Sequence, residues 1–268
     1  MMQLHILHRT AYRYEEPVKY TAQILRLTPR REGAQRILSW SIRAPGRRTE
    51  QVDAHGNITH LLTLEDPHRA FEIDVRGVVE MTGDEEFVRF DGSLSPLAYL
   101  APTALTAASA PMVALAREHL NGSGDQRERL YRLAAGVYAK VAYMPGTTSV
   151  EETAAQAFTR GQGVCQDQAH VFLACCRAVG VPARYVSGYL CSVDGGEAAS
   201  HAWVDAWLED AQGWLGIDVT HLSPMGPKHC RLAVGRDYLD AAPVRGVRRG
   251  GGRETMDVSV AATASGEQ

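Results

Sequence analysis

A cysteine placed for nucleophilic chemistry lies in the stretch Gly161-Gln162-Gly163-Val164-Cys165. Apolar residues with helical spacing begin at or just after it, which predicts that Cys165 lies at the amino-terminal end of a helix. Unpaired backbone N–H groups and the positive end of the helix dipole favour an anion at that position. Because the thiolate is the reactive form of cysteine, the position favours a nucleophile. The alternative is a glycine-rich turn whose cysteine packs as a small apolar residue.

A histidine and an aspartate of the kind that activate a thiol follow later in the chain. His201 begins one predicted strand, and Asp218 lies near the end of the next strand. Antiparallel pairing about a turn centred between residues 211 and 212 would put His201 opposite residue 222, a few residues beyond Asp218. Taken singly, the histidine fits a packed strand end and the acid fits an exposed turn. The order of cysteine on a helix, then histidine and aspartate on successive strands, predicts a catalytic triad of Cys165, His201 and Asp218.

These three residue types can carry acyl transfer through a thioester. Cys165 would attack a carbonyl carbon, and His201 would take the thiol proton and later return one to the leaving amine. Asp218 would accept a hydrogen bond from the other imidazole nitrogen and so fix the tautomer. The backbone N–H of Cys165 would help to hold the oxyanion, and Gln162 is a further candidate donor.

A metal site is the other chemistry that cysteine and histidine suggest, but their spacing argues against one. Tetrahedral zinc sites use short paired intervals between ligands. The candidate ligands do not form such pairs: Cys165, His170, Cys175, Cys176, His229 and Cys230. Cys175 and Cys176 are adjacent on a predicted helix and would point in different directions, which favours core packing. We therefore predict neither a metal nor another cofactor.

Composition limits the class of protein. The chain has 268 residues, of which 45% are hydrophobic and 22% charged, as is typical of soluble globular proteins. A net charge of −3 gives no electrostatic reason to expect nucleic acid or a membrane as partner. The amino terminus lacks a signal-peptide pattern, and no apolar run approaches the roughly 20 residues of a membrane helix. Five irregularly spaced cysteines argue against a disulfide framework, so we predict a cytoplasmic protein.

Two folded regions joined by a linker are predicted. Residues 1–95 alternate polar and apolar side chains in several short segments, which predicts a β-sandwich-like amino-terminal domain. Turn residues at 53–57 predict a hairpin connection with His55 on the surface. Proline, serine, threonine and alanine dominate residues 96–111, which we interpret as the linker.

Residues 112–262 are predicted to form the catalytic core. The first part has the apolar periodicity of helices, and the segment after residue 183 alternates like an antiparallel meander. Helices followed by an antiparallel sheet make an α+β fold. Residues 263–268 are predicted to be a flexible tail.

The residues around the candidate triad resemble the transglutaminase-like superfamily. The resemblance is carried by segments 163–170, 177–189, 200–204 and 213–218. Segments 25–29, 53–57 and 233–246 resemble the bacterial and archaeal branch known as transglutaminase-like cysteine proteases, which has an amino-terminal β domain. The resemblance implies a papain-like core of helices packed on an antiparallel sheet. It also implies a Cys-His-Asp triad, which maps onto Cys165, His201 and Asp218.

Two positions depart from the family pattern. The family commonly has an Asp-Pro-Thr run where this chain has Asp218-Val219-Thr220, and the missing proline would loosen the turn after the acid. His221 follows at a position where asparagine is more usual, and the sequence offers no account of it.

The predicted function is cysteine-dependent acyl transfer on peptide or isopeptide amides, with hydrolysis of the thioester. A transglutaminase, in which an amine resolves the thioester, is one alternative. A non-catalytic module that binds protein in the same cleft is another. The predicted partner is a peptide or protein substrate. The sequence leaves open the substrate's identity, the oligomeric state and the role of the amino-terminal domain.

Overall fold

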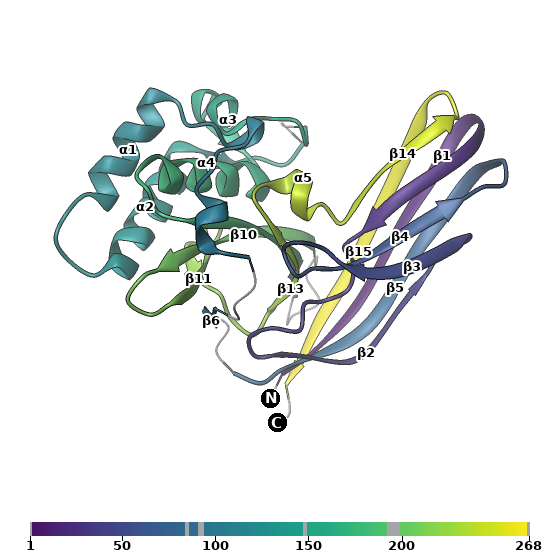
Figure 1. The fold of residues 1–268 in the computed structure, drawn as a ribbon, viewed down its shortest axis with the longest axis horizontal. Helices are drawn as coiled ribbons and strands as arrows, with labels where there is room; N and C mark the ends of the chain where they lie inside the picture. The colour runs from purple at the N-terminus through teal and green to yellow at the C-terminus, as the bar shows by residue number, and fades with distance from the viewer. Residues whose placement is uncertain (1, 84–85, 91–93, 147–148, 192–198, 267–268) are drawn as a thin grey trace.

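The computed structural model describes residues 2–83, 86–90, 94–146, 149–191 and 199–266. A large β-sheet lies on one side of the molecule, and a smaller sheet covered by helices lies on the other (Figure 1). The predicted α+β fold, with an amino-terminal β region and a core of helices on a sheet, is confirmed. Within the described residues, none of the helices has the length and apolar character needed to cross a membrane.

The large sheet has seven strands and includes Met2 and Gly266, the first and last described residues. They are β1 (Met2–Leu25), β2 (Gln35–Arg43), β3 (Arg47–Val52), β4 (Ile58–Leu64), β5 (His68–Met81), β14 (Val244–Gly250) and β15 (Glu254–Gly266).

The order in the large sheet is β2-β5-β1-β4-β3, and β14 and β15 pair with the other edge of β1. The register of β1 shifts between Arg13 and Val18, where its neighbours change from β5 and β15 to β4 and β14. The strands turn back together at this point, so the sheet folds over itself (Figure 1). Alternate side chains of β1, such as Leu4, Ile6 and Leu25, are buried inside the fold.

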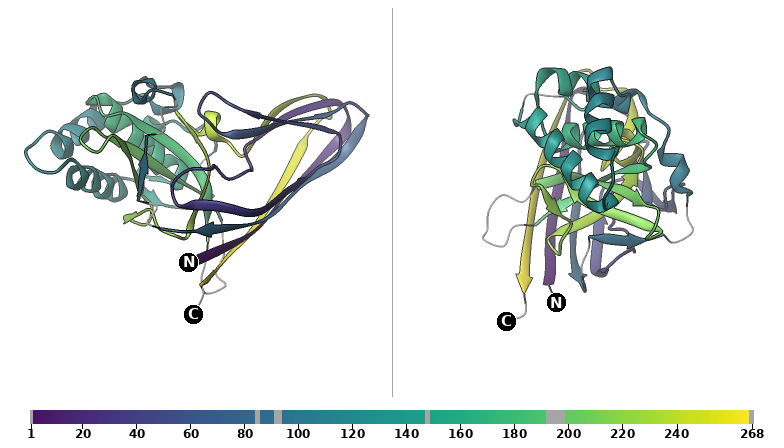
Figure 2. Two further views of the ribbon diagram at one scale, coloured as in Figure 1. Left: turned by 60° about the horizontal axis from the view of Figure 1, so that its bottom comes forward. Right: turned by 90° about the vertical axis from the view of Figure 1, so that its left-hand side faces the viewer.

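The carboxyl-terminal segment corrects the predicted boundaries. The sequence assigned residues up to 262 to the catalytic core and residues 263–268 to a flexible tail. In the structure, β15 pairs with β1 along Met2–Tyr14, and Figure 2 shows it at the edge of the large sheet beside β1. The local pattern is weak because small residues dominate 261–266, and the partner strand lies at the opposite end of the chain. Residues 267–268 lie outside the described residues.

The core sheet has six strands in the order β12-β11-β10-β9-β13, with β6 paired to β11. They are β6 (Phe87–Arg89), β9 (Ala183–Leu190), β10 (Ala199–Leu208), β11 (Gly213–Asp218), β12 (Ser223–Pro224) and β13 (His229–Gly235). The strands β7 (Ala142–Tyr143) and β8 (Gln162–Gly163) pair separately. The helices are α1 (Ala110–Leu120), α2 (Gln126–Lys140), α3 (Ala154–Arg160), α4 (Cys165–Ala178) and α5 (Tyr238–Ala241).

The predicted linker, residues 96–111, packs against the core. It contains two short 3₁₀ helices, Pro96–Tyr99 and Ala104–Thr106, and the start of α1. The buried guanidinium group of Arg177, on α4, donates hydrogen bonds to the Tyr99 carbonyl at 2.9 Å and to the Thr106 hydroxyl at 2.7 Å. The segment is therefore part of the folded core rather than a free connection.

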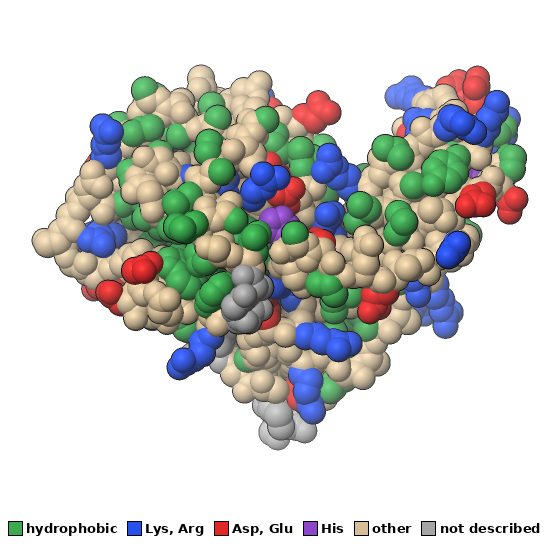
Figure 3. All heavy atoms as spheres, viewed as in Figure 1, with side chains coloured by type: hydrophobic (Ala, Val, Ile, Leu, Met, Phe, Trp, Pro, Cys, Tyr) green, Lys and Arg blue, Asp and Glu red, His purple; other side chains and the backbone are tan. Residues whose placement is uncertain are grey.

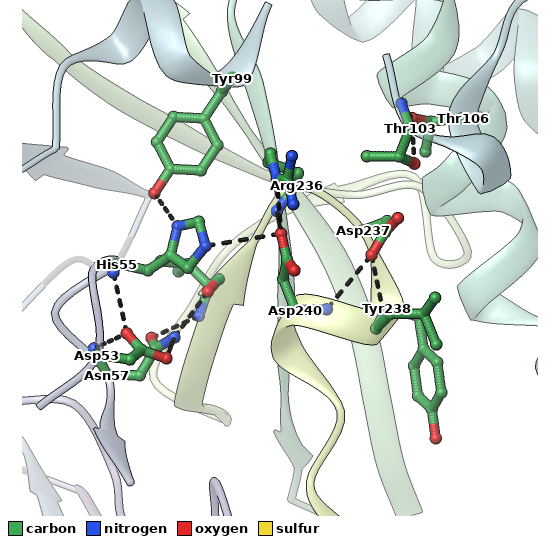
Figure 4. A network of polar contacts seen from close by, with 12 residues as sticks. Asp53, His55, Asn57, Tyr99, Thr103, Thr106, Arg236, Asp237, Tyr238 and Asp240 are labelled. Atoms are coloured by element: carbon green, nitrogen blue, oxygen red, sulfur yellow. Dashed lines mark hydrogen bonds and ion pairs between the residues drawn. The ribbon is translucent and has the colours of Figure 1, made fainter. Parts of the chain in front are cut away.

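The hairpin between β3 and β4 joins the two sheets (Figure 4). The Asn57 amide donates to the Val234 carbonyl and accepts from the Val234 N–H, both at 2.8 Å. His55 was predicted to lie on the surface, but its Nδ1 lies 2.9 Å from the Tyr99 hydroxyl and its Nε2 lies 3.6 Å from Asp240. The histidine is partly buried because the hairpin tip inserts against the core, a contact that local turn residues do not reveal.

Candidate active site

Cys165 is the first residue of α4, as the periodicity predicted. The preceding residue, Val164, has no capping side chain, but its N–H donates to the Asp167 carboxylate at 2.8 Å. Gly163 permits this contact, because a Cβ there would lie 2.7 Å from the Cβ of Asp167. The helix start is thus fixed by its own first turn, and Cys165 remains partly exposed while residues 166–177 are buried.

His201 on β10 and Asp218 at the end of β11 are neighbours across the core sheet. Leu208 pairs with Gly213, and the register continues to Val204 and Ile217. Extending it puts His201 level with Thr220 instead of residue 222, because the turn is centred between residues 210 and 211, one residue earlier than predicted. His201 Nε2 lies 2.8 Å from Asp218 Oδ2.

The turn after Asp218 is well held without the proline of the family pattern. Oδ1 of Asp218 accepts the N–H groups of Thr220 at 3.0 Å and His221 at 3.1 Å. The Thr220 hydroxyl donates to Gln168 on α4 at 2.7 Å. These bonds connect the turn to the helix that begins with Cys165.

Two further histidines contact Asp218, and sequence reasoning gave neither this role. His221 Nδ1 lies 2.8 Å and His229 Nε2 lies 3.1 Å from the same oxygen, Oδ2. His229 Nδ1 accepts the N–H of Gly226 at 3.2 Å, so its proton is on Nε2 and is donated to the acid. His229 comes from β13, which reaches the site only through sheet pairing. No local motif could have indicated this contact.

The hydrogen bonds outweigh the effect of burial on both charged groups. Burial raises the pKa of a carboxyl group, but hydrogen bonds from His201, His221 and His229 hold the pKa of Asp218 well below its usual range. Burial lowers the pKa of His201, while its hydrogen bond to Asp218 and its interaction with Cys165 raise the pKa to about 10. His201 is therefore an imidazolium at neutral pH, paired with a buried carboxylate.

Cys165 and His201 line one cavity of about 410 Å³. Its other lining residues are Tyr138, Tyr143, Leu190, Ser200, Thr220 and His221. Asp218 is fully buried behind His201. The structure thus brings the predicted cysteine and histidine to the same space and places the acid behind the histidine. Gln162, the candidate oxyanion donor, is not among the lining residues.

The residues considered for a metal site are dispersed. His170 Nε2 accepts the N–H of Tyr238, and the Cys175 thiol donates to the Met112 carbonyl. Among the described residues, the group close enough to hold an ion is His201, Asp218 and His221, whose ligand atoms lie within 4.8 Å of one another. Here the histidine nitrogens already contact the carboxylate as hydrogen-bond partners.

Comparison with known proteins identifies the family of this chain. The profile of the bacterial transglutaminase-like N-terminal region matches residues 4–80, and that of the transglutaminase-like superfamily matches residues 113–219. A protein of Mycobacterium leprae is 32% identical over 98% of this chain and 99% of its own length. The chain belongs to the transglutaminase-like superfamily. A Mycobacterium tuberculosis relative is 30% identical over 90% of this chain and 86% of its own length.

Two other relatives of the superfamily carry functional names. A candidate cysteine protease from Cytophaga hutchinsonii has the same fold, with a TM-score of 0.81 over 100% of this chain and 92% of its own, at 23% identity. A protein-glutamine gamma-glutamyltransferase of Pseudomonas aeruginosa is 32% identical over 34% of this chain and 15% of its own length. Family membership supports general cysteine acyl-transfer chemistry.

Proposed function

We propose that this transglutaminase-like protein catalyses acyl transfer on peptide or isopeptide amides, with Cys165 as nucleophile and water as the final acceptor. The observation that carries the proposal is the His201–Asp218 hydrogen bond of 2.8 Å, made by a histidine that shares its cavity with a cysteine at a helix start. A buried carboxylate that fixes a histidine beside a thiol is the arrangement required for thiol catalysis.

The proposed reaction proceeds in two steps. The Cys165 thiolate attacks the amide carbonyl, the C–N bond breaks, and the imidazolium of His201 gives its proton to the departing amine. Water then attacks the thioester while His201 takes its proton, and the carboxylic acid leaves as the thiolate re-forms. Asp218 keeps the imidazole oriented throughout and stabilises its charged form. The backbone N–H of Cys165, at the helix start, is the candidate oxyanion donor.

The alternative acceptor is an amine, which would make the protein a transglutaminase. Both reactions share the thioester and the same three residues, so the choice depends on the second nucleophile. The relatives include both kinds of enzyme by name: one is a candidate protease, which uses water, and one is a glutamyltransferase, which uses an amine. The third possibility is a module that binds protein in the cleft without reaction.

Unfolded β-casein with and without a fluorescent primary amine separates these outcomes. We expect new chain termini with wild type, and none with Cys165→Ala. Incorporation of the amine without new termini would favour a transglutaminase. Equal product with wild type and Cys165→Ala would refute the mechanism. Binding without Cys165-dependent product would favour the non-catalytic module.

We also propose that the reaction takes place in the cytoplasm. The structure has five free cysteines, at positions 165, 175, 176, 191 and 230. Free thiols in this number are typical of a reducing compartment. Fractionation of the source cells with an antibody against the chain tests this, and recovery outside the cytoplasm would contradict it.

A further inference from the structure

A second cavity, beneath the edge of the large sheet, adjoins the active-site cavity. Ser200, which is exposed, lines both the cavity of Cys165 and this second cavity of about 250 Å³. The other lining residues of the second cavity are His8, Thr10, Tyr238, Pro243, Val244, Met256 and Val258. A third cavity of about 320 Å³ shares Tyr238, Val244 and Met256 with it. Figure 3 shows the surface hollowed between the helical part and the folded sheet, where α5 meets β14 in Figure 1.

The second cavity is lined mainly by apolar side chains, two of which are unusually exposed. Met256 is 55% and Val258 48% exposed. Both belong to the inner face of the sheet, since they pair with the buried residues Tyr12 and Thr10 of β1. An inner-face side chain would ordinarily be covered. These two are left open beside the cleft.

The backbone of β15 is also open at this place. Across the described part of the chain, β15 pairs only with β1. The N–H of Glu15 donates to the Arg253 carbonyl, which fixes the alternation of the antiparallel ladder. In that alternation, the N–H and C=O groups of Met256 and Val258 point away from β1. The same two residues therefore offer to the cleft apolar side chains and backbone groups with which no described strand pairs.

Tyr238 forms a fixed wall opposite this edge. Asp237 caps the short helix α5 by accepting the N–H groups of Leu239 and Asp240. The Tyr238 N–H donates to the buried His170 at 3.1 Å. Figure 4 shows the Tyr238 ring pointing away from this polar network. These hydrogen bonds hold Tyr238 in place through residues of the catalytic core.

We propose that the acyl donor is an extended polypeptide segment that adds as a strand to the free edge of β15, with apolar side chains in the cavity between Tyr238 and Val258. Strand addition combines backbone hydrogen bonds with pockets for alternate side chains, and both are present along β15. Because Ser200 lines both cavities, a segment bound in the second cavity can extend into the cavity of Cys165. This inference rests on the proposed function only for the reaction of the bound segment with Cys165.

Val258→Pro tests the backbone contact. The substitution removes an N–H that points away from β1, so the existing ladder keeps its bonds. With β-casein we expect KM to rise about fivefold to tenfold, the effect of one lost hydrogen bond, and kcat to change little. Val258→Ala keeps the N–H, so its KM should rise less than that of Val258→Pro. Iodoacetamide labelling of Cys165, which needs no strand, should stay at the wild-type rate. Unchanged KM in Val258→Pro would overturn the proposal.

Amide hydrogen exchange tests strand addition without turnover. In Cys165→Ala, excess β-casein should slow exchange at Met256 and Val258. It should not affect Ser259, whose N–H points toward β1. Unaltered exchange at the first two residues would overturn the inference even if wild type cleaves casein. Slowed exchange together with no Cys165-dependent product would instead refute the proposed function and leave the strand site in place.

Discussion

His229 Nε2 lies 3.1 Å from Asp218 Oδ2, the oxygen that also accepts the hydrogen bond of His201. The acid at the end of β11 is therefore held from β10 on one side and from β13 on the other. A buried carboxylate needs such donors, because the loss of solvent otherwise favours its neutral form. We assign His229 the role of a positioning residue that acts through Asp218.

Replacement of His229 should show this role. His229→Phe removes one donor, so we expect kcat on β-casein to fall about tenfold, within the range for a hydrogen bond to a charged group. Because Asp218 then accepts one hydrogen bond fewer, its pKa should move up toward its usual range. His229→Gln retains a donor and should recover most of the rate. A rate for His229→Gln as low as that of His229→Phe would mean that the effect is only structural.

The raised pKa of His201 predicts different pH profiles for two reactions at Cys165. Turnover needs a proton on His201 for the leaving amine, so kcat should decline as the pH rises through about 10, where His201 loses its proton. Alkylation by iodoacetamide needs only the thiolate and should not decline there. In His201→Ala we expect alkylation at neutral pH to be at least about tenfold slower, because the stabilising cation is gone. Equal alkylation in both proteins would contradict the stabilisation of the Cys165 thiolate by the His201 imidazolium.

A buried carboxylate between the two sheets predicts acid-sensitive stability. Burial opposes the ionisation of Glu32, but three guanidinium groups lower its pKa to about 2: those of Arg30, Arg184 and Arg231. Because this value is below that of the unfolded chain, the contribution is present above about pH 4.5 and is lost as the pH falls toward 2. Glu32→Gln should lower the free energy of unfolding at pH 7 by about 3 kcal/mol, as expected when a buried pair is broken.

Urea unfolding at pH 7 and pH 3 would measure this difference, which should be smaller at the lower pH. Glu72→Gln is the matched control, because Glu72 pairs with Arg9 on the exposed face of the large sheet. We expect no measurable change from the control. A Glu32→Gln variant as stable as wild type at pH 7 would contradict the prediction.

Removal of the last six residues should destabilise the large sheet. Thr263–Ser265 of β15 pair with Gln3–His5, so deleting 263–268 removes ladder hydrogen bonds that a flexible tail would not make. Thr263 and Ser265 each exchange two bonds with β1, so we expect the free energy of unfolding to fall by about 4 kcal/mol, from roughly 1 kcal/mol per hydrogen bond. The double variant Thr263→Ala/Ser265→Ala keeps the backbone ladder and should unfold close to wild type. An unaltered urea midpoint after deletion would support the flexible tail instead.

The sequence predicted a site residue's position where a reactive residue type lies within a clear local pattern of secondary structure. Cys165 could be placed at a helix start because glycines precede it and apolar spacing follows. His201 and Asp218 could be assigned to successive strands, but their register depends on where the turn between them is centred, which the sequence pattern left uncertain by a residue. The contact from His229 could not be found, since it arises from the order of strands across the sheet.

The boundaries failed for a related reason. Alternation identified the strands of the amino-terminal region, yet nothing local in the small residues of β15 indicates that their partner is β1. The prediction of a linker at residues 96–111 was also based on local composition, which does not reveal tertiary contacts. The contacts from Arg177 to Tyr99 and Thr106 join elements that are distant in sequence. Local pattern thus predicts which elements form, and tertiary packing decides which of them belong together.

The pairing of β1 with β15 also sets the order in which the protein can mature. Translation delivers β1 well before β15, so β1 lacks this neighbour while the intervening chain is synthesised. Until then, one edge of β1 and its apolar inner face stay open to other chains, the condition under which nascent proteins aggregate or recruit chaperones. The large sheet can therefore close only after β15 has been synthesised. The edge proposed to receive substrate forms at the same step.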